Sequence, residues 1–434
     1  MNLIIQNGRV LDPQSGRDEA ADLLIEGDRI REVAPSGGMK LRDAEVIDVK
    51  GAWVTPGLID LHVHLREPGQ EYKEDVASGS RAATAGGFTS IVAMPNTDPV
   101  IDNGELVQFV IDRGKRAGLC RVLCCGAVSV GQKSERLAPF GEMKRAGAVA
   151  VTDDGRPVTN PVMMRRALEY SQDFDLPVLS HAEDAQLSGH GQMHEGVIST
   201  QLGLQGVPGV AEDVAVARDI LLAEHTGGRL HIQHVSTARS VDLVRDAKAR
   251  GVRVTAEATP HHFSLTHEAV MGYHTSTKVN PPLREGKDRA AVIAGLSDGT
   301  IDAIATDHAP HSSIEKDVAF ADAMNGMIGL QTALPLALNL WRAGMPLLKV
   351  IALMTTGPAR VLGLSTPAIR EGALADLAIF DPAATWQLDD ESNYSKSKNS
   401  PFWGRPLEGR VRATIVGGKV VYQYDRKPVW SVQH

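Results

Sequence analysis

Apolar, β-branched runs alternate with longer Ala- and Arg-rich stretches of helical spacing from Val54 to about residue 365. The eight runs end at Asp60-Leu61-His62-Val63-His64, Met94-Pro95-Asn96, Gly126-Ala127-Val128, Thr152-Asp153-Asp154, Ser180-His181-Ala182-Glu183, Gln233-His234-Val235-Ser236, Thr259-Pro260-His261-His262 and Thr306-Asp307-His308. Eight strand and helix units are what a closed parallel barrel needs. The pattern therefore predicts an α/β fold with a TIM-like (β/α)8 barrel over residues 55–365.

The two flanks of this region have a different pattern. Residues 1–54 and 366–434 alternate apolar and polar positions between Gly and Pro turns, as in Ala375–Phe380 and Ala413–Val416. This alternation is typical of half-buried antiparallel strands. We therefore expect one small β-sandwich built from both chain ends. The long segment from Gly189 to Gly209 shows no strand pattern and is predicted to be a loop over the barrel mouth.

Composition and charge narrow the class of protein. The chain has 434 residues, of which 43% are hydrophobic and 42 are glycines, as in globular α/β proteins. A formal net charge of -8 argues against a nucleic-acid partner, because phosphate backbones are held by clustered cations. No signal peptide or membrane-length apolar run is evident, so we expect a cytoplasmic protein without membrane contact. Cys120, Cys124 and Cys125 lie in or beside an apolar run and are expected to be buried and reduced.

Histidine and aspartate gather at the predicted strand ends. His62 and His64 are two residues apart on a strand, so their side chains leave the same face, roughly 7 Å apart at the backbone. His181, His234 and Asp307 lie at three later strand ends, and barrel active sites form at that rim. Neutral imidazoles and carboxylates are the ligands that Zn²⁺ prefers in such sites.

Five ligands exceed the need of one tetrahedral zinc ion, so the sequence predicts two ions that share a bridging anion. The fourth strand ends in Asp153 and Asp154 rather than in lysine, and either carboxylate could be the bridge. Lys73 and Lys144 do not fall at a strand end, where a carboxylated lysine would be needed.

The motif His62-Val63-His64-Leu65-Arg66-Glu67-Pro68-Gly69 resembles the signature of dihydroorotases in the amidohydrolase superfamily. Further similar motifs are Met94-Pro95-Asn96-Thr97, Thr152-Asp153-Asp154-Gly155, His181-Ala182-Glu183-Asp184, His234-Val235-Ser236-Thr237, Asn280-Pro281-Pro282-Leu283-Arg284 and Ala305-Thr306-Asp307-His308-Ala309-Pro310-His311. The resemblance covers most of the chain and is closest to the bacterial branch in which an aspartate replaces the carboxylated lysine. It implies a barrel of the amidohydrolase type, with Asp154 as the bridging ligand.

The resemblance also assigns the other site residues. It implies that one zinc ion is held by His62, His64, Asp154 and Asp307, and the other by Asp154, His181 and His234. It implies that the substrate carboxylate is held by Arg66, Asn96 and His311, and the ring by Asn280 and the backbone near Asn325 and Gly326. The family usually shows Pro-Phe-Gly where this chain has Met324-Asn325-Gly326.

The implied activity is the reversible interconversion of dihydroorotate and N-carbamoyl-L-aspartate in pyrimidine biosynthesis. The expected mechanism is attack by a zinc-activated hydroxide, with Asp307 as the proton shuttle. Ring closure consumes a proton, so acid should favour dihydroorotate. Two macromolecular partners are suggested by the resemblance: a second copy of the chain and aspartate carbamoyltransferase.

Two alternatives remain open at this point. Hydantoinase, dihydropyrimidinase and allantoinase share the barrel and the metal cluster, but Arg66 favours a substrate that carries a carboxylate. A catalytically inactive paralogue would be marked by lost metal ligands, whereas all six are present. Eight further histidines have no metal-ligand placement, and most of them are expected to be loop or structural residues, with His261 and His262 as candidates for supporting the ligands from behind: His190, His194, His225, His261, His262, His267, His274 and His434.

Overall fold

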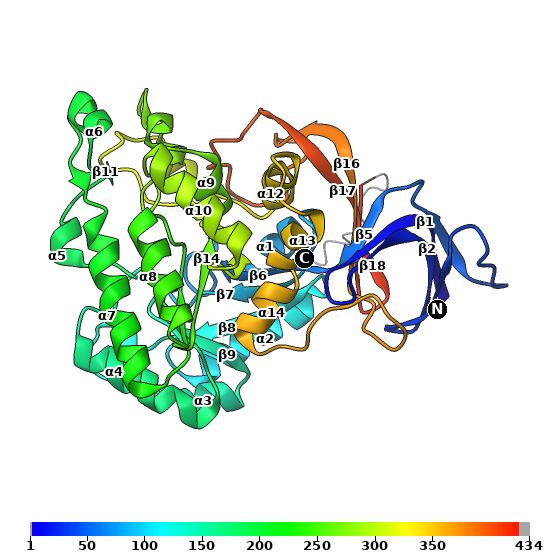
Figure 1. Cartoon of the computed structure of the whole chain (residues 1–434), viewed down its shortest axis with the longest axis horizontal. Helices are drawn as coiled ribbons and strands as arrows, with labels where there is room; N and C mark the ends of the chain where they lie inside the picture. The colour runs from blue at the N-terminus through cyan, green and yellow to red at the C-terminus, as the bar shows by residue number, and fades with distance from the viewer. Residues whose placement is uncertain (1, 425–434) are drawn as a thin grey trace.

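The computed structural model describes residues 2–424, so His434 lies outside the described residues. Its central element is a parallel sheet (Figure 1) of strands β6 (Leu58–Val63), β7 (Phe88–Ala93), β8 (Arg121–Gly126), β9 (Ala148–Thr152), β10 (Val178–Ser180), β13 (Leu230–Ile232), β14 (Val254–Ala258) and β15 (Ala303–Ile304). A parallel bridge between Val63 and His308 brings the first and last strands together. The predicted barrel of eight strands is confirmed, and each predicted run contains one strand.

Helices surround the barrel on its outside (Figure 1): α1 (Val76–Ala85), α2 (Gly104–Ala117), α3 (Phe140–Arg145), α4 (Pro161–Tyr170), α7 (Val210–Thr226), α8 (Ala238–Ala249), α10 (Gly286–Asp298), α12 (Ala333–Arg342), α13 (Leu347–Leu353) and α14 (Thr356–Leu362). Helix α2 shows how the sequence fixes their ends. Asn103 caps its start by accepting a hydrogen bond from the Leu106 N–H, and Gly118 ends it in the left-handed conformation. At Gly114 a side chain would collide with Val122 of β8, so glycine allows the close contact between helix and strand.

The barrel interior below the strand ends is apolar. Leu61, Val92, Cys125 and Leu179 come from four different strands and form one buried cluster, onto which Val361 of α14 packs. All three cysteines are buried and unpaired. A filled interior leaves the carboxyl ends of the strands as the place where polar side chains can meet.

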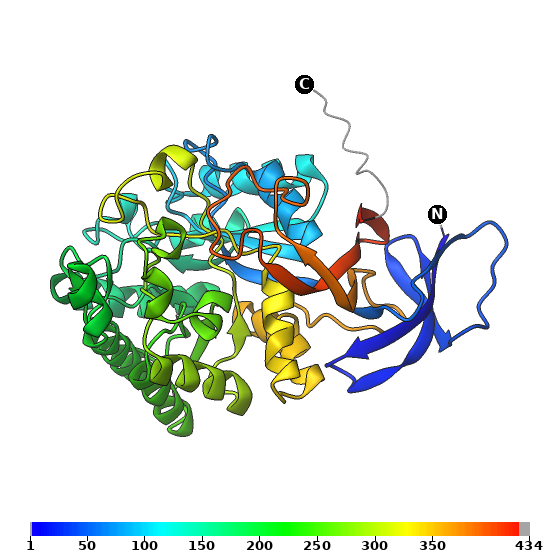
Figure 2. The same cartoon turned by 90° about the horizontal axis from the view of Figure 1, so that it is seen from above.

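The two chain ends form one mixed sheet of eight strands: β1 (Asn2–Asp12), β2 (Arg17–Glu26), β3 (Arg29–Pro35), β4 (Glu45–Asp48), β5 (Trp53–Pro56), β16 (Leu377–Gln387), β17 (Pro406–Val416) and β18 (Lys419–Gln423). Strand β5 joins the two ends, because it pairs in parallel with β1 and antiparallel with β16. Figure 2 shows these first and last strands side by side, next to the barrel. The prediction that both ends share one β structure is confirmed.

The segment 189–209 departs from its prediction as a loop without strands. It contains β11 (Met193–His194), α6 (Val197–Leu202) and β12 (Gly206–Val207), and the two strands pair in parallel. Strands of two residues are too short to show a period-two pattern, which explains why the sequence did not reveal them. Other short helices of the barrel loops are α5 (Ala185–Ser188), α9 (Pro260–Ser264) and α11 (Ser313–Lys316).

Candidate metal centre and substrate pocket

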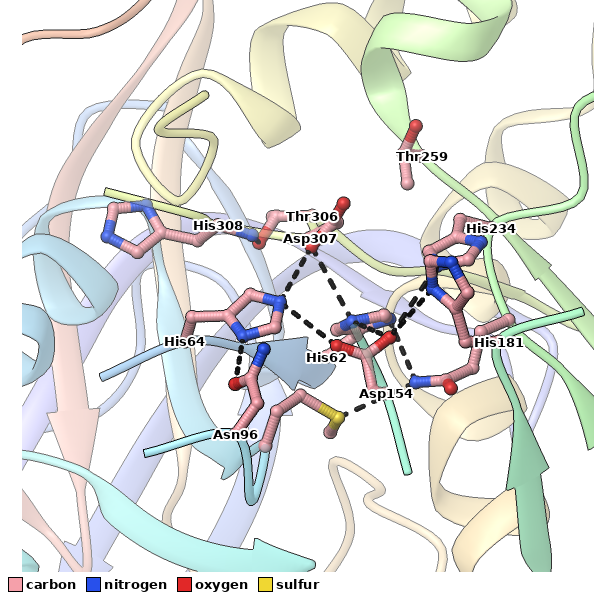
Figure 3. Close-up of polar contacts among 12 residues, drawn as sticks. His62, His64, Asn96, Asp154, His181, His234, Thr259, Thr306, Asp307 and His308 are labelled. Carbon is pink, nitrogen blue, oxygen red and sulfur yellow. Dashed lines mark hydrogen bonds and ion pairs between the residues drawn. The ribbon is translucent and has the colours of Figure 1, made fainter. Parts of the chain in front are cut away.

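Six buried side chains converge at the carboxyl ends of five barrel strands (Figure 3). They come from β6 and the residue after it, and from the residues that follow β9, β10, β13 and β15: His62, His64, Asp154, His181, His234 and Asp307. These six residues, which we call the floor, are the same six that the sequence predicts as metal ligands.

Asp154 lies at the centre of the floor. Its Oδ1 atom is 3.3 Å from both His62 Nε2 and His181 Nδ1 and 3.6 Å from His234 Nε2, and its Oδ2 atom is 3.4 Å from His64 Nε2. One carboxylate therefore faces all four imidazoles. This is the position that a ligand shared between two ions requires.

Asp307 closes the floor on the side of His64. Its Oδ1 atom is 3.0 Å from His64 Nε2 and 3.5 Å from His62 Nε2. Within residues 2–424, both His62, His64, Asp307 and His62, Asp154, His234 have the ligand spacing of a metal site. The two groups share His62.

Asp153, the alternative bridge, faces away from the floor. Its Oδ1 atom accepts hydrogen bonds from the backbone N–H groups of Val128 and Ser129 at 2.8 and 3.1 Å, and its Oδ2 atom accepts one from the Ser129 hydroxyl. Both oxygens thus bind the loop after β8. The geometry favours Asp154 over Asp153 as a metal ligand.

A buried carboxylate stands behind His62. Glu257 Oε1 is 2.6 Å from His62 Nδ1, and Glu257 Oε2 is 3.0 Å from His231 Nε2. If Nδ1 of His62 donates to the carboxylate, its Nε2 presents a lone pair to the floor. Nε2 is buried and has no hydrogen-bond partner, so the lone pair is available to an ion.

His64 and His181 are oriented in the same way. His64 Nδ1 donates to Asn96 Oδ1 at 2.8 Å, and His181 Nε2 donates to Glu183 Oε2 at 3.1 Å. Their other ring nitrogens face the floor. Such contacts fix the tautomer and the direction of each imidazole before an ion arrives.

The electrostatics of the floor suit a divalent cation. Burial alone would raise the pKa of Asp154 and lower that of His62, but their mutual attraction reverses both shifts. The pKa of Asp154 is held well below its usual range, and that of Asp307 is lowered too, chiefly by His62 against the effect of burial. The carboxylates are therefore ionised and depend on positive charge beside them. A divalent cation would supply that positive charge in place of a proton on His62 and leave the imidazole lone pairs free, so this buried cluster of carboxylates and imidazoles fits zinc.

Three site residues have backbone conformations that side chains rarely adopt. The φ angles of Arg66, His234 and Asp307 are 61°, 32° and 48°. Residues with positive φ other than glycine store backbone strain, which the surrounding contacts must hold. All three lie two or three residues beyond the end of a barrel strand, where the chain must turn the side chain into the barrel mouth.

A cavity of about 280 Å³ lies above the floor. Its wall includes all six residues that the sequence predicts as substrate contacts, which we call the rim: Arg66, Asn96, Asn280, His311, Asn325 and Gly326. These six residues come from separate sequence motifs, none of which shows by itself that they share one cavity wall. The structure brings the predicted substrate contacts and five of the six predicted metal ligands into the wall of one pocket, and the sixth ligand, His62, is fully buried beside Asp154.

One side of the rim is cationic. Buried Arg66 donates from Nε to the Pro310 carbonyl at 3.2 Å, and its Nη2 lies 3.3 Å from His311 Nε2. Burial, with the charges of Arg66 and Lys73, lowers the pKa of His311 to about 2. His311 is therefore neutral, and the positive charge of this side comes from the guanidinium, whose remaining N–H groups suit an anion.

Comparisons with known proteins decide the family. A model described as "Dihydro-orotase-like" matches residues 51–240, and one described as "Amidohydrolase family" matches residues 214–422. A dihydroorotase of Pelobacter propionicus is 55% identical over 429 residues, which cover 98% of this chain and 100% of that protein. A dihydroorotase of Geotalea daltonii is 54% identical over 427 residues, with coverage of 98% and 100%. The chain belongs to the dihydroorotase family.

Solved structures support the fold of this dihydroorotase-family chain. An L-hydantoinase (dihydropyrimidinase) from Arthrobacter aurescens has a TM-score of 0.85 and 25% sequence identity, and the match covers 97% of this chain and 96% of that one. A dihydropyrimidinase from Brevibacillus agri has a TM-score of 0.82 at 22% identity, with coverage of 98% and 95%. These likenesses concern the architecture. The much higher identity to dihydroorotases separates the chain from the rival cyclic amidases at the level of family.

A third group with ligand spacing, His194, Glu285 and Asp288, lies outside this pocket. Arg284 Nη1 lies 3.3 Å from His194 Nδ1, and Lys287 forms an ion pair with Glu285 at 2.7 Å. Two cations already contact these side chains. The contact of Arg284 with His194 connects β11 to the residues just before α10.

The sequence did not single out Glu257, His231 or Glu183. Glu257 is a carboxylate inside the apolar strand run of β14, and such a buried charge in a strand is the one signal that could have identified it. Glu183 was noted only as part of a motif. Among residues 2–424, no helix is long and apolar enough to cross a membrane.

Proposed function

We propose that this dihydroorotase-family chain catalyses the reversible hydrolysis of dihydroorotate to N-carbamoyl-L-aspartate. The observation that carries this proposal is the pairing of the floor with Arg66 in one cavity. A cyclic amide that lacks a carboxylate gives a buried arginine no partner, whereas dihydroorotate carries one. The family membership and the 55% identity to a dihydroorotase support the same substrate.

The floor would hold two zinc ions, with Asp154 as the shared ligand in place of a carboxylated lysine. His62, His64 and Asp307 would complete one site, and His181 and His234 the other. When bound, zinc would lower the pKa of a water molecule and polarise the carbonyl oxygen that is attacked. The chain's part is to hold six donors in a dry cluster with their lone pairs directed inward.

We assign the proton transfer to Asp307. Its Oδ1 atom lies 3.0 Å from His64 Nε2, within the floor, and Asp307 also lines the cavity where the substrate would sit. A carboxylate there can accept the proton of the attacking water and deliver it to the departing amide nitrogen. During ring closure the same group works in the opposite direction.

The substrate carboxylate would bind between Arg66, His311 and Asn96. Asn96 uses Oδ1 to accept from His64, which leaves its Nδ2 donors for an anion. The ring would then extend from this side towards Asn280 and the backbone of Asn325 and Gly326. We also propose that residues 55–365 form the catalytic unit, with 1–54 and 366–434 as its β domain.

An assay of four substrates tests this function. The purified protein should hydrolyse dihydroorotate and lose that activity on chelation, and added Zn²⁺ should restore it. Hydantoin, dihydrouracil and allantoin should be turned over far more slowly, because none carries the carboxylate. Faster turnover of any of these three than of dihydroorotate would assign the pocket to another cyclic amidase.

Two partners remain predictions: a second copy of the chain and aspartate carbamoyltransferase. Size-exclusion chromatography with light scattering, on the protein alone and mixed with aspartate carbamoyltransferase from the same organism, tests both. A complex would appear as a common peak of higher mass. If this protein elutes with the mass of a monomer both alone and in the mixture, both predictions are wrong.

A further inference from the structure

Two asparagines line the pocket with opposite hydrogen-bonding character. Asn96 accepts from His64 Nδ1 through Oδ1 at 2.8 Å, so its N–H donors remain for the ligand. Asn280 donates from Nδ2 to Glu183 Oε2 at 2.8 Å, so its Oδ1 acceptor remains. An amide has one donor end and one acceptor end, and the partner behind it determines which end the pocket sees.

Glu183 has the properties needed to fix the direction of Asn280. Its side chain is only 19% exposed, and Glu183 lies three residues after the end of β10, in the same loop as the floor residue His181. An ionised carboxylate only accepts hydrogen bonds. If the Asn280 amide turned over, its Oδ1 would meet Glu183 Oε2 at hydrogen-bond distance, and two acceptors would repel each other.

A second contact anchors the same carboxylate oxygen. His181 Nε2 lies 3.1 Å from Glu183 Oε2, and Asn280 Nδ2 lies 3.3 Å from that imidazole nitrogen. Both N–H groups therefore converge on one oxygen. The floor residue His181 holds Glu183 in place, and Glu183 in turn holds Asn280.

We propose that Glu183 is a positioning residue that makes Asn280 an acceptor for a ring N–H of the substrate. This inference rests on the proposed function, since the ring of dihydroorotate carries a carboxylate on one carbon and an N–H donor on the nitrogen across the ring from that carbon. The pocket then has donors at Arg66 and Asn96 and an acceptor at Asn280. A substrate placed the other way round would set its carboxylate against Asn280 Oδ1 and leave Arg66 without a partner, so the arrangement fixes the direction in which the ring enters.

The contact with His181 and the contact with Asn280 predict separable effects. Loss of Glu183 should lower the turnover number and the metal content because His181 loses its anchor. It should raise the Michaelis constant because Asn280 loses its fixed direction. A double-mutant cycle isolates the second effect, because residues that act through one another are not additive. The variants are Glu183→Ala, Asn280→Ala and the double variant, assayed with dihydroorotate after metal content has been measured.

We expect Glu183→Ala and Asn280→Ala each to raise KM for dihydroorotate about tenfold, since each loses a directed hydrogen bond near a charge. The double variant should have a KM within about twofold of Asn280→Ala. Glu183→Gln should recover most of the affinity, because its amide oxygen can accept from both His181 and Asn280. Glu224→Ala, which removes an exposed carboxylate of α7, serves as the control.

Additive effects of Glu183→Ala and Asn280→Ala on KM would overturn the proposal, as would a Glu183→Gln variant no better than Glu183→Ala. If Glu183→Ala does not fold, Glu183→Gln and Asn280→Ala still decide it, because the glutamine must then keep KM far below that of Asn280→Ala. If the wild-type protein does not hydrolyse dihydroorotate, the proposed function is wrong, and this inference is wrong with it.

Discussion

The floor and the rim of the pocket are built by different means. Every floor residue lies in a barrel strand or one to three residues beyond its end, and its direction follows from the strand. The rim combines Arg66 and Asn96, which follow β6 and β7, with Asn280, His311 and Asn325, which lie on long loops. The barrel alone can place metal ligands. Substrate contacts on loops need further support.

Residues from the C-terminal part of the chain supply some of that support. Asn399 Oδ1 accepts from the His311 backbone N–H at 3.1 Å, and its Nδ2 donates to the Ala309 and Gly326 carbonyls, both at 3.0 Å. One buried side chain thus holds the backbone at Ala309 and His311 and at Gly326. The comparison predicts severe, chemical defects from changes in the floor and smaller, affinity-type defects from changes in the rim.

The largest expected effect comes from the centre of the floor. Asp154→Ala should lose most of its bound metal and reduce turnover nearly to background, because one carboxylate faces all four imidazoles. Asp153→Ala is the matched control, since its side chain binds the loop after β8 and should affect stability more than metal content. Elemental analysis of both proteins measures the difference. Greater metal loss in the Asp153 variant would reverse the assignment.

Asp307→Asn should separate metal binding from chemistry within the floor. An amide oxygen can still contact an ion, but the amide cannot accept a proton. General acid and base catalysis commonly contributes about a hundredfold to ten-thousandfold, so the turnover number should fall by at least about a hundredfold in both directions. KM should change far less. Full metal content with only a severalfold loss of turnover would show that another group moves the proton.

Arg66→Ala tests the rim where it is most polar. The variant should keep its metal and raise KM for dihydroorotate about tenfold to hundredfold, because a charge-assisted contact to a carboxylate is lost. Arg66→Lys should recover only part of the affinity, since an ammonium cannot form the two-pronged contact. Steady-state kinetics and metal analysis suffice. Unchanged affinity in Arg66→Ala would place the substrate carboxylate elsewhere.

The same difference explains how far the sequence could predict the structure. His62 and His64 were visible as ligands because strand spacing puts both side chains on one face, and the other floor residues follow strands that the hydrophobic pattern revealed. The contacts of Glu257 with His62 and of Asn399 with His311 left no such trace, because the partners are far apart in the sequence. The pairing of Asp153 with Ser129 likewise depends on a neighbouring strand end. Patterns along the chain report strands and their ends, but not hydrogen bonds between distant loops.

The smallest expected effect tests whether the rim depends on this distant support. Asn399→Ala removes one acceptor and two donors from buried backbone groups, so His311 and Gly326 should lose their fixed positions without any change in the floor. We expect KM for dihydroorotate to rise about threefold, the melting temperature to fall by a few degrees, and metal content to stay the same. Asn393→Ala is a matched control, because Asn393 lies in the same segment and donates to the carbonyls of Ser395 and Ser397 rather than to the rim. A rise in KM common to both variants would mean that the whole segment, and not the Asn399 contacts, supports the rim. Metal loss in Asn399→Ala would contradict the distinction between floor and rim, because it would show that the two are not supported independently.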